Sequence, residues 1–134
     1  MITGFKDLLE VARTESEPQR LLFVFCKAEL PEDATAEEKS AFDRGEGGAL
    51  TPVICVDKTP SEVPEFERLV VESEQTGQNW DVVFVAAMSG RGGIEPSSDD
   101  VQQPMNMMVE SIRLGKVANF LPLDRAGVSI DLGL

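Results

Sequence analysis

The residues of this chain most suited to chemistry lie in two short segments, each directly after an apolar run. They are Asp57, Lys58 and Thr59 after the first run and Ser89, Arg91, Gly92 and Gly93 after the second. Successive N–H groups of a glycine-rich turn can form a concave anion site, and Arg91 can hold a phosphate or carboxylate through two hydrogen bonds. The turn matches neither GxGxxG nor GxxxxGK[ST], so the alternative is a surface loop whose glycines permit unusual backbone angles.

Several other kinds of chemistry are excluded or restricted by residue types. The chain holds no His and no Tyr, which excludes within it His-based acid–base catalysis, His-ligated metals and Ser-His-Asp or Cys-His nucleophiles. Cys26 and Cys55 lie inside apolar runs without CxxC or metal-ligand spacing, where a free cysteine usually acts as a small buried hydrophobe. Two alternatives stay open: a disulfide, if their strands are neighbours, and a redox response, which needs an exposed thiol of low pKa.

The charge of the chain is strongly acidic, with 24 acidic and 12 basic residues and a formal net charge of −12. Because phosphate contacts need clustered Lys and Arg, we expect no nucleic-acid partner and no anionic membrane partner. The acids concentrate between Glu29 and Glu46, with a local net charge of −5. Glu29, Glu32 and Asp33 have the oxygen ligands that suit Mg²⁺ or Ca²⁺, but a solvated linker is the favoured interpretation, so we expect neither a metal nor a cofactor.

The hydrophobic pattern predicts alternating strands and helices within a single domain, residues 1–134. Nearly continuous apolar runs predict buried strands at residues 20–28, 52–57 and 80–88, and weaker strands at 117–121 and 128–132. Helical spacing or capping residues predict helices at 4–13 and 36–43, a third from Ser61, and a fourth from Asp99 or Asp100 that ends at Gly115. The expected fold is therefore α/β: a mostly parallel sheet of four to five strands with helices on its faces and an antiparallel C-terminal edge. In such a sheet the two chemistry-bearing segments share one rim.

Four segments of the sequence resemble a family of short uncharacterised bacterial proteins, some of which carry the name "ribonucleotide reductase subunit alpha". The segments are LLFVFCKAELP, GGALTPVICVDKTP, WDVVFVAAMSGRGG and MVESIRLG, and the resemblance spans about Leu8 to Asp124. The name implies a large radical-bearing barrel with several redox cysteines. This chain is too short and holds only two cysteines, so the resemblance adds no functional residues.

These observations favour a small binding domain over an enzyme. No apolar run approaches the ~20 residues of a membrane span, and charged residues interrupt any signal pattern at the N-terminus, so we expect a cytoplasmic protein. The expected partner is another protein or a second copy of the chain, with Met107 as a candidate dimer contact. The alternative is a binder of, or an enzyme acting on, a phosphate- or carboxylate-bearing metabolite at the rim of the sheet.

Overall fold

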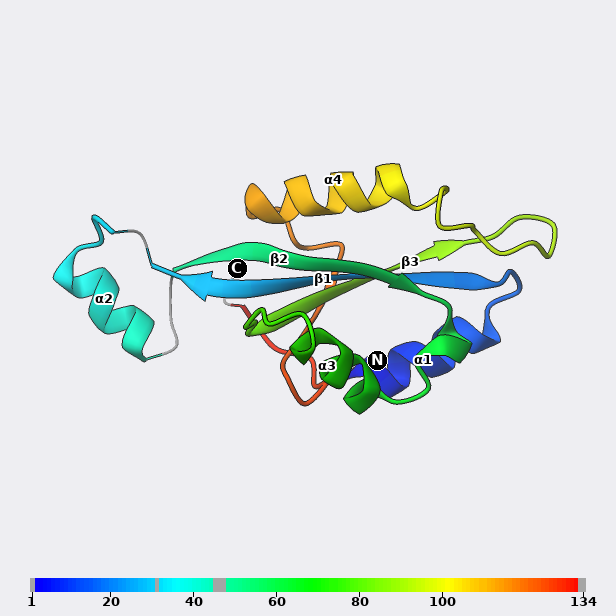
Figure 1. Cartoon of the computed structure of the whole chain (residues 1–134), viewed down its shortest axis with the longest axis horizontal. Coiled ribbons are helices and arrows are strands. Elements are labelled where there is room, and N and C mark those ends of the chain that lie inside the picture. The colour runs from blue at the N-terminus through cyan, green and yellow to red at the C-terminus, as the bar shows by residue number, and fades with distance from the viewer. Residues whose placement is uncertain (1, 31, 45–47, 133–134) are drawn as a thin grey trace.

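The computed structural model describes residues 2–30, 32–44 and 48–132. Its centre is a sheet of four strands in the order β2–β1–β3–β4, and every neighbouring pair is antiparallel. Helix α4 lies on one face of the sheet, and α1 and α3 lie on the other (Figure 1). The strands are β1 (Gln19–Glu29), β2 (Ala49–Lys58), β3 (Val82–Ser89) and β4 (Leu121–Leu123). The helices are α1 (Phe5–Thr14), α2 (Ala36–Asp43), α3 (Phe66–Glu74) and α4 (Gln102–Arg113), with a 3₁₀ turn, η1, at Pro60–Glu62.

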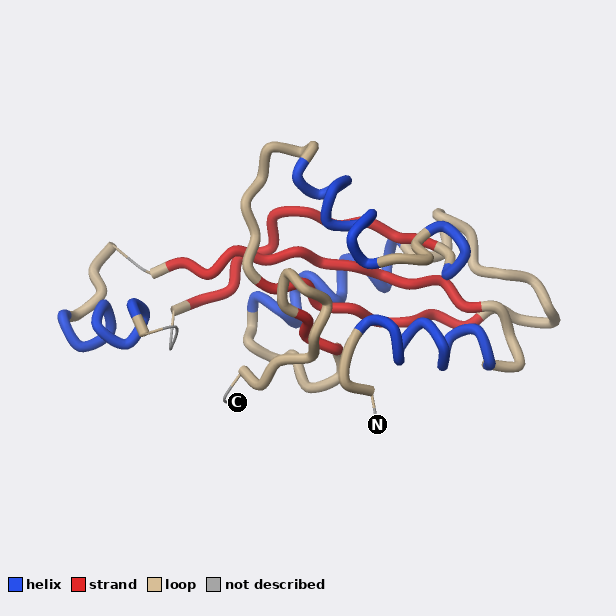
Figure 2. Tube along the Cα trace, turned by 90° about the horizontal axis from the view of Figure 1, so that it is seen from below, coloured by secondary structure: helices blue, strands red, loops and turns tan. Residues whose placement is uncertain are grey.

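The antiparallel sheet shows that the prediction of a mostly parallel sheet was wrong. Helices cover both faces of β1, so its apolar run continues through Phe23, Val24 and Phe25 as it would in a buried parallel strand. Continuous burial indicates that both faces are covered and leaves the direction of the neighbouring strands open. The deciding feature is α2, which lies beyond the end of the sheet (Figure 2). Because α2 does not cross a face, β1 and β2 form a long hairpin.

The later connection, from β2 through η1 and α3 to β3, does cross the sheet. Both β2 and β3 are antiparallel to β1, so they run in the same direction with β1 between them. Their C-terminal ends therefore lie at one end of the sheet, as the parallel arrangement would also require. This shared end holds both segments that the sequence singled out.

The side chains of β1 and β3 alternate between two hydrophobic cores, one on each face of the sheet. On the face of α1 and α3, Phe23 packs among residues that include Phe5 and Trp80. On the face of α4, Val24 and Phe84 pack among residues that include Met108. The two cores bury both faces of the central strands β1 and β3. Backbone groups that could bind a partner are therefore sought at the edges of the sheet.

The two edges of the sheet differ in what lies beside them. The β4 edge is covered by the following chain: Leu123 forms a bridge with Ser129, and the N–H of Ile130 donates to the Pro122 carbonyl at 3.1 Å. In the described part of the chain, no strand pairs with the outer side of β2. A ten-residue strand is therefore left as a free edge.

The hairpin of β1 and β2 extends past the end of β3 as a two-stranded arm that carries α2 at its tip (Figures 1 and 2). The predicted helix at 36–43 is confirmed: Thr35 and Glu38 form a capping box, and no residue of α2 is buried. Glu46, at the end of the acidic segment, lies outside the described residues. Neither an isolated two-stranded ribbon nor a helix of this length is stable by itself in water, so the arm depends on its attachment to the sheet.

Candidate functional site

The predicted site residues lie at one end of the sheet but are not on adjacent strands. Asp57 pairs in register with Leu22 of β1, and Ser89 pairs with Gln19 of the same strand. The start of β1 therefore separates the two predicted segments. Sequence reasoning missed this intervening strand end, and the residues it contributes determine the chemistry of the rim.

Arg20 is the most important residue that the sequence did not single out. Its Nε donates to the Asp57 carboxylate at 2.6 Å, and its other nitrogens donate to the Pro96 carbonyl at 3.1 Å and the Ser98 hydroxyl at 3.0 Å. Ser98 in turn lies 3.4 Å from the same Asp57 oxygen. Asp57 is thus neutralised within the chain. The signal that could have found this pair is a single arginine at the head of an apolar run.

Lys58 and Thr59 also find partners within the chain. The Lys58 ammonium lies 3.1 Å from the Glu72 carboxylate on α3. The N–H and hydroxyl of Thr59 donate to Glu62 at 2.8 and 3.0 Å and begin the 3₁₀ turn η1. The backbone hydrogen bond from Thr59, followed by the side-chain one, lowers the pKa of Glu62. These residues connect β2 to the helix layer rather than presenting free groups to a ligand.

The glycine turn after β3 already holds an anion from its own chain. Gly92 and Gly93 have positive φ angles of 60° and 81°, and the N–H of Gly93 donates to the Glu17 carboxylate at 2.8 Å. The Ser89 hydroxyl accepts a 2.8 Å bond from Gln19. Arg91 bridges Ile94 through the backbone and is exposed. The turn can therefore hold a carboxylate, and in this structure an internal carboxylate occupies it.

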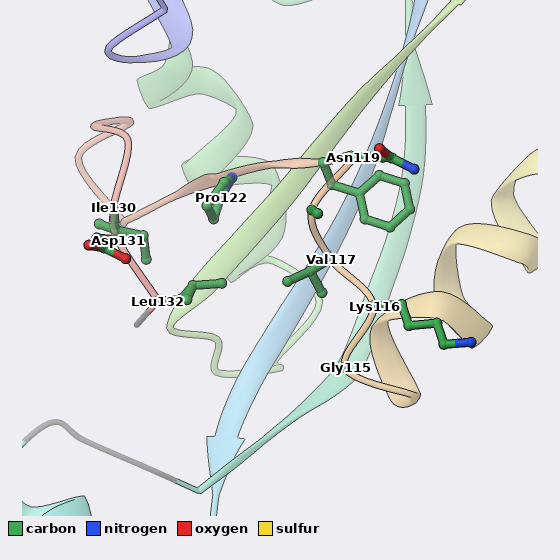
Figure 3. A pocket seen from close by; sticks show the side chains of 10 residues that line it. Gly115, Lys116, Val117, Asn119, Pro122, Ile130, Asp131 and Leu132 are labelled. Carbon is green, nitrogen blue, oxygen red and sulfur yellow. The ribbon is translucent and has the colours of Figure 1, made fainter. Parts of the chain in front are cut away.

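Two cavities lie away from these residues. One, of about 530 Å³, is formed by the segment after α4 and the C-terminal segment, with Val117, Ile130 and Leu132 among its lining (Figure 3). The other, of about 710 Å³, lies between α1, the start of α3 and the loop at Gly127. Neither is lined by any residue of the predicted site. These two cavities therefore do not supply the concave pocket that a small-molecule site at the rim normally requires.

The two cysteines lie on neighbouring strands, and both are free thiols. Cys55 pairs in register with Val24, so it faces α4 on the same side as Cys26. Burial raises the pKa of Cys26 to about 12, and it also raises the pKa of the exposed Cys55. A raised pKa disfavours the reactive thiolate. The redox hypothesis therefore loses the low-pKa thiol on which it depends.

The described residues offer no other obvious reactive centre. Among them, no group of three or more Cys, Asp or Glu side chains is placed to hold a metal ion. None of the described helices is both long and apolar enough to cross a bilayer.

The free side of β2 presents unpaired backbone groups whose direction follows from the bonds of β1. The N–H of Gly90 donates to the Pro18 carbonyl, and the N–H of Asp81 donates to the Cys26 carbonyl, both at 2.8 Å. Even-numbered residues of β1 thus point their backbone groups toward β3. Since these groups alternate along a strand, odd-numbered residues of β1 bond to β2.

The register then assigns a direction to each residue of β2. Ile54, Val56 and Lys58 pair with odd-numbered residues of β1 and point inward. Cys55 and Asp57 consequently point their N–H and C=O groups outward. We call the outer side of residues 52–58 the open edge.

The N-terminal limit of the open edge is set by Pro52 and a bulge. The register of β1 with β2 shifts between Phe25 and Cys26, which leaves Val53 as an extra residue. Pro52 pairs with Cys26, an even-numbered residue, so the Pro52 nitrogen also points outward. A proline in this position costs the sheet no hydrogen bond.

The fold and this edge define the chain as a small antiparallel α/β domain with helices on both faces and one long edge strand. Comparison with protein-family models, with curated proteins and with solved structures finds no match. The resemblance described above therefore stays an expectation.

Proposed function

We propose that this chain is a protein-interaction domain that binds an extended polypeptide segment at the open edge. The observation that carries the proposal is the outward direction of the N–H and C=O groups of Cys55 and Asp57. Unpaired groups in a row along an edge strand are a template for another strand. Addition of a strand would complete hydrogen bonds that β2 makes on one side only.

The charge distribution supports the same surface. Residues 49–56 carry no charge, and the two charged residues at the end of β2 are each paired within the chain, Asp57 with Arg20 and Lys58 with Glu72. The open edge is thus a nearly neutral strip on a chain of net charge −12. A partner can approach this strip without placing its own charges against unpaired acids.

Residue-resolved amide exchange tests this proposal. The labelled chain is titrated with extended peptides of alternating apolar and polar residues, including the sequence of β2 itself. We expect the amides of Cys55 and Asp57 to become at least about tenfold more protected. The amides of Ile54 and Val56, already bonded to β1, serve as internal controls.

Two matched variants separate the open edge from other exposed surfaces. Cys55→Lys places a strongly hydrated charge on the open edge and should abolish the protection. Met107→Lys makes the same kind of change on the exposed side of α4, where Met107 is 63% exposed, and should leave the protection intact. Failure of every peptide, and of rising protein concentration, to protect Cys55 and Asp57 would contradict the proposal.

The glycine turn supports a second candidate, which is binding of a phosphate- or carboxylate-bearing metabolite at Arg91, Gly92 and Gly93. The supporting observation is the Glu17 carboxylate on the Gly93 N–H, which an external anion would replace. Thermal-shift measurements with such anions test it, since a ligand at a hundred times its Kd stabilises by ~2.7 kcal/mol. Unchanged binding after Arg91→Ala would count against this candidate.

We also propose that the protein works in the cytoplasm. The two free cysteines support this location, because thiols persist in reducing compartments. Cell fractionation tests the proposal, and recovery of the protein outside the cytoplasm would overturn it.

A further inference from the structure

We infer that the segment bound at the open edge is the open edge of a second copy of this chain, with Cys55 of each copy opposite Asp57 of the other. This inference rests on the proposed function and names its partner. The two copies would run antiparallel across a two-fold axis at Val56. Such a contact is isologous, because the same residues are used on both sides.

The register follows from which residues have free backbone groups. Cys55 and Asp57 point outward and are separated by one residue, so placing them opposite each other forms two reciprocal pairs across the axis. Each hydrogen-bonded pair in an antiparallel ladder exchanges two bonds. The outward N–H and C=O groups of Cys55 and Asp57 in each copy are then all paired with those of the other copy.

The neighbouring registers are worse for stated reasons. Moving the axis to Cys55 would place Asp57 opposite Val53, the extra residue at the bulge. Moving it to Asp57 would place two carboxylates directly opposite each other, which is destabilising. It would also pair Cys55 with Thr59, whose N–H already donates to Glu62 at 2.8 Å. Only the axis at Val56 avoids all three conflicts.

Charge explains why a second copy can bind at this place. Two chains of net charge −12 repel each other over most of their surfaces. At the open edge the repulsion is reduced, because Asp57 is paired with Arg20 and Lys58 with Glu72. In the inferred register Lys58 lies opposite Ile54 of the second copy, so the two Lys58 side chains do not face each other.

The side chains along the axis differ in exposure. Cys55 is exposed on the side of α4, the helix that packs against β2 on that face. Val56 is half-buried and packs against the core under α1 and α3. A valine pair across the axis would extend that core from one copy into the next.

Disulfide mapping tests the inferred register directly. In a Cys55→Ala background, Val56→Cys places two thiols across a non-hydrogen-bonded pair, with Cα atoms ~4.5 Å apart and within disulfide range. Ile54→Cys is the matched control, since its two copies would lie about 14 Å apart along the strands. An added copper–phenanthroline oxidant takes two electrons and two protons from each thiol pair. We expect at least tenfold faster cross-linking for Val56→Cys.

Sedimentation equilibrium and amide exchange of the unmodified chain complete the experiment and do not depend on the cysteine variants folding. We expect a monomer–dimer equilibrium, with the Cys55 and Asp57 amides protected in step with the dimer. The Cys55→Asp chain should be monomeric, because its new carboxylate would lie directly opposite Asp57 of the second copy. Equal or faster cross-linking of Ile54→Cys would overturn the register. A monomer at all concentrations would overturn the second copy as partner, and peptide protection of Cys55 and Asp57 would then still support the proposed function. If the chain dimerises while these two amides stay unprotected, the open edge is not the interface.

Discussion

The Arg20–Asp57 pair gives a quantitative test of how the end of the sheet that contains the predicted site residues is held together. Arg20 connects the start of β1 to β2 and to the loop between β3 and α4. It donates to Asp57 on β2 at 2.6 Å, and to the Pro96 carbonyl at 3.1 Å and the Ser98 hydroxyl at 3.0 Å in the loop. The side chains of Arg20 and Asp57 are 13% and 21% exposed, so water competes only partly for these bonds. Removing Arg20 therefore leaves a mostly buried carboxylate with one long contact to Ser98.

The expected magnitudes follow from the bonds that each substitution removes. Hydrogen bonds to charged groups contribute ~1.5–3 kcal/mol, and remaining solvent contact reduces this. We expect Arg20→Ala to lower the free energy of unfolding by about 2–3 kcal/mol. Asp57→Ala should lower it by about 1–2 kcal/mol, because Arg20 keeps its other two acceptors. A double-mutant cycle should give a coupling of ~1 kcal/mol.

Urea unfolding measures these values, with an unchanged slope against denaturant as the sign that the folded and unfolded states stay comparable. Arg113→Ala is the control, because its ion pair with Glu110 joins side chains that are 61% and 65% exposed. Its effect should stay within ~0.5 kcal/mol. A coupling below ~0.3 kcal/mol between Arg20 and Asp57, or an Arg20→Ala loss no larger than that of Arg113→Ala, would refute the reasoning.

Three further predictions concern the thiols, the glycine turn and the 3₁₀ turn. In the folded chain Cys55 should react with a thiol reagent while Cys26 stays unmodified until unfolding, and the Cys55 rate should rise with pH, as peptide mass spectrometry can follow. Gly90→Ala should destabilise by about 1–3 kcal/mol in a urea melt, since its new Cβ would lie 2.0 Å from the Ile94 carbonyl oxygen. Thr59→Val keeps the backbone N–H bond to Glu62 but removes the hydroxyl bond, which is the second contribution to the lowered pKa of Glu62. The difference in free energy of unfolding between the native chain and Thr59→Val should therefore be largest above the ordinary pKa of Glu. It should shrink as the pH falls through the lowered pKa of Glu62 in the folded chain. A difference that instead grows in acid would contradict that assignment.

The strands and helices of this chain could be predicted because their signals are local. The apolar runs around Phe23 and Phe84 form β1 and β3, and the spacing of Thr35 and Glu38 produces the capping box of α2. Each of these features depends on residues within one segment. Their existence therefore follows from hydrophobic period and capping chemistry alone.

The direction of the strands could not be predicted, because it depends on where a connecting helix packs. α2 and the segment of η1 and α3 each follow a strand, and each begins with a capping box, at Thr35 for α2 and at Thr59 for η1. α3 buries Phe66 and Leu69 against the sheet and so carries the chain across it. α2 buries no residue and stays at the tip of the hairpin. The absence of an apolar stripe in residues 36–43 is the signal that distinguishes the two helices.

The sequence predicted which end of the sheet holds the candidate site residues, but not which side chains they bond to. Asp57 and Ser89 lie at the same end of the sheet because β2 and β3 run in the same direction. Their partners Arg20 and Gln19 come from the start of β1, which only the antiparallel arrangement inserts between them. The open edge had one local signal, Pro52 within an apolar run, since a proline in a strand favours an edge position.

The features that limit the open edge also restrict how further strands could be added to it. Pro52 and the bulge at Val53 end the usable backbone on one side, and Thr59, committed to Glu62, ends it on the other. Between them only Cys55 and Asp57 point outward, so an added strand gains few hydrogen bonds and an extended stack cannot form. The surrounding charge of −12 opposes any contact that departs from this neutral strip. Under the proposed function, the same restrictions would favour a short antiparallel partner and oppose indefinite addition of strands.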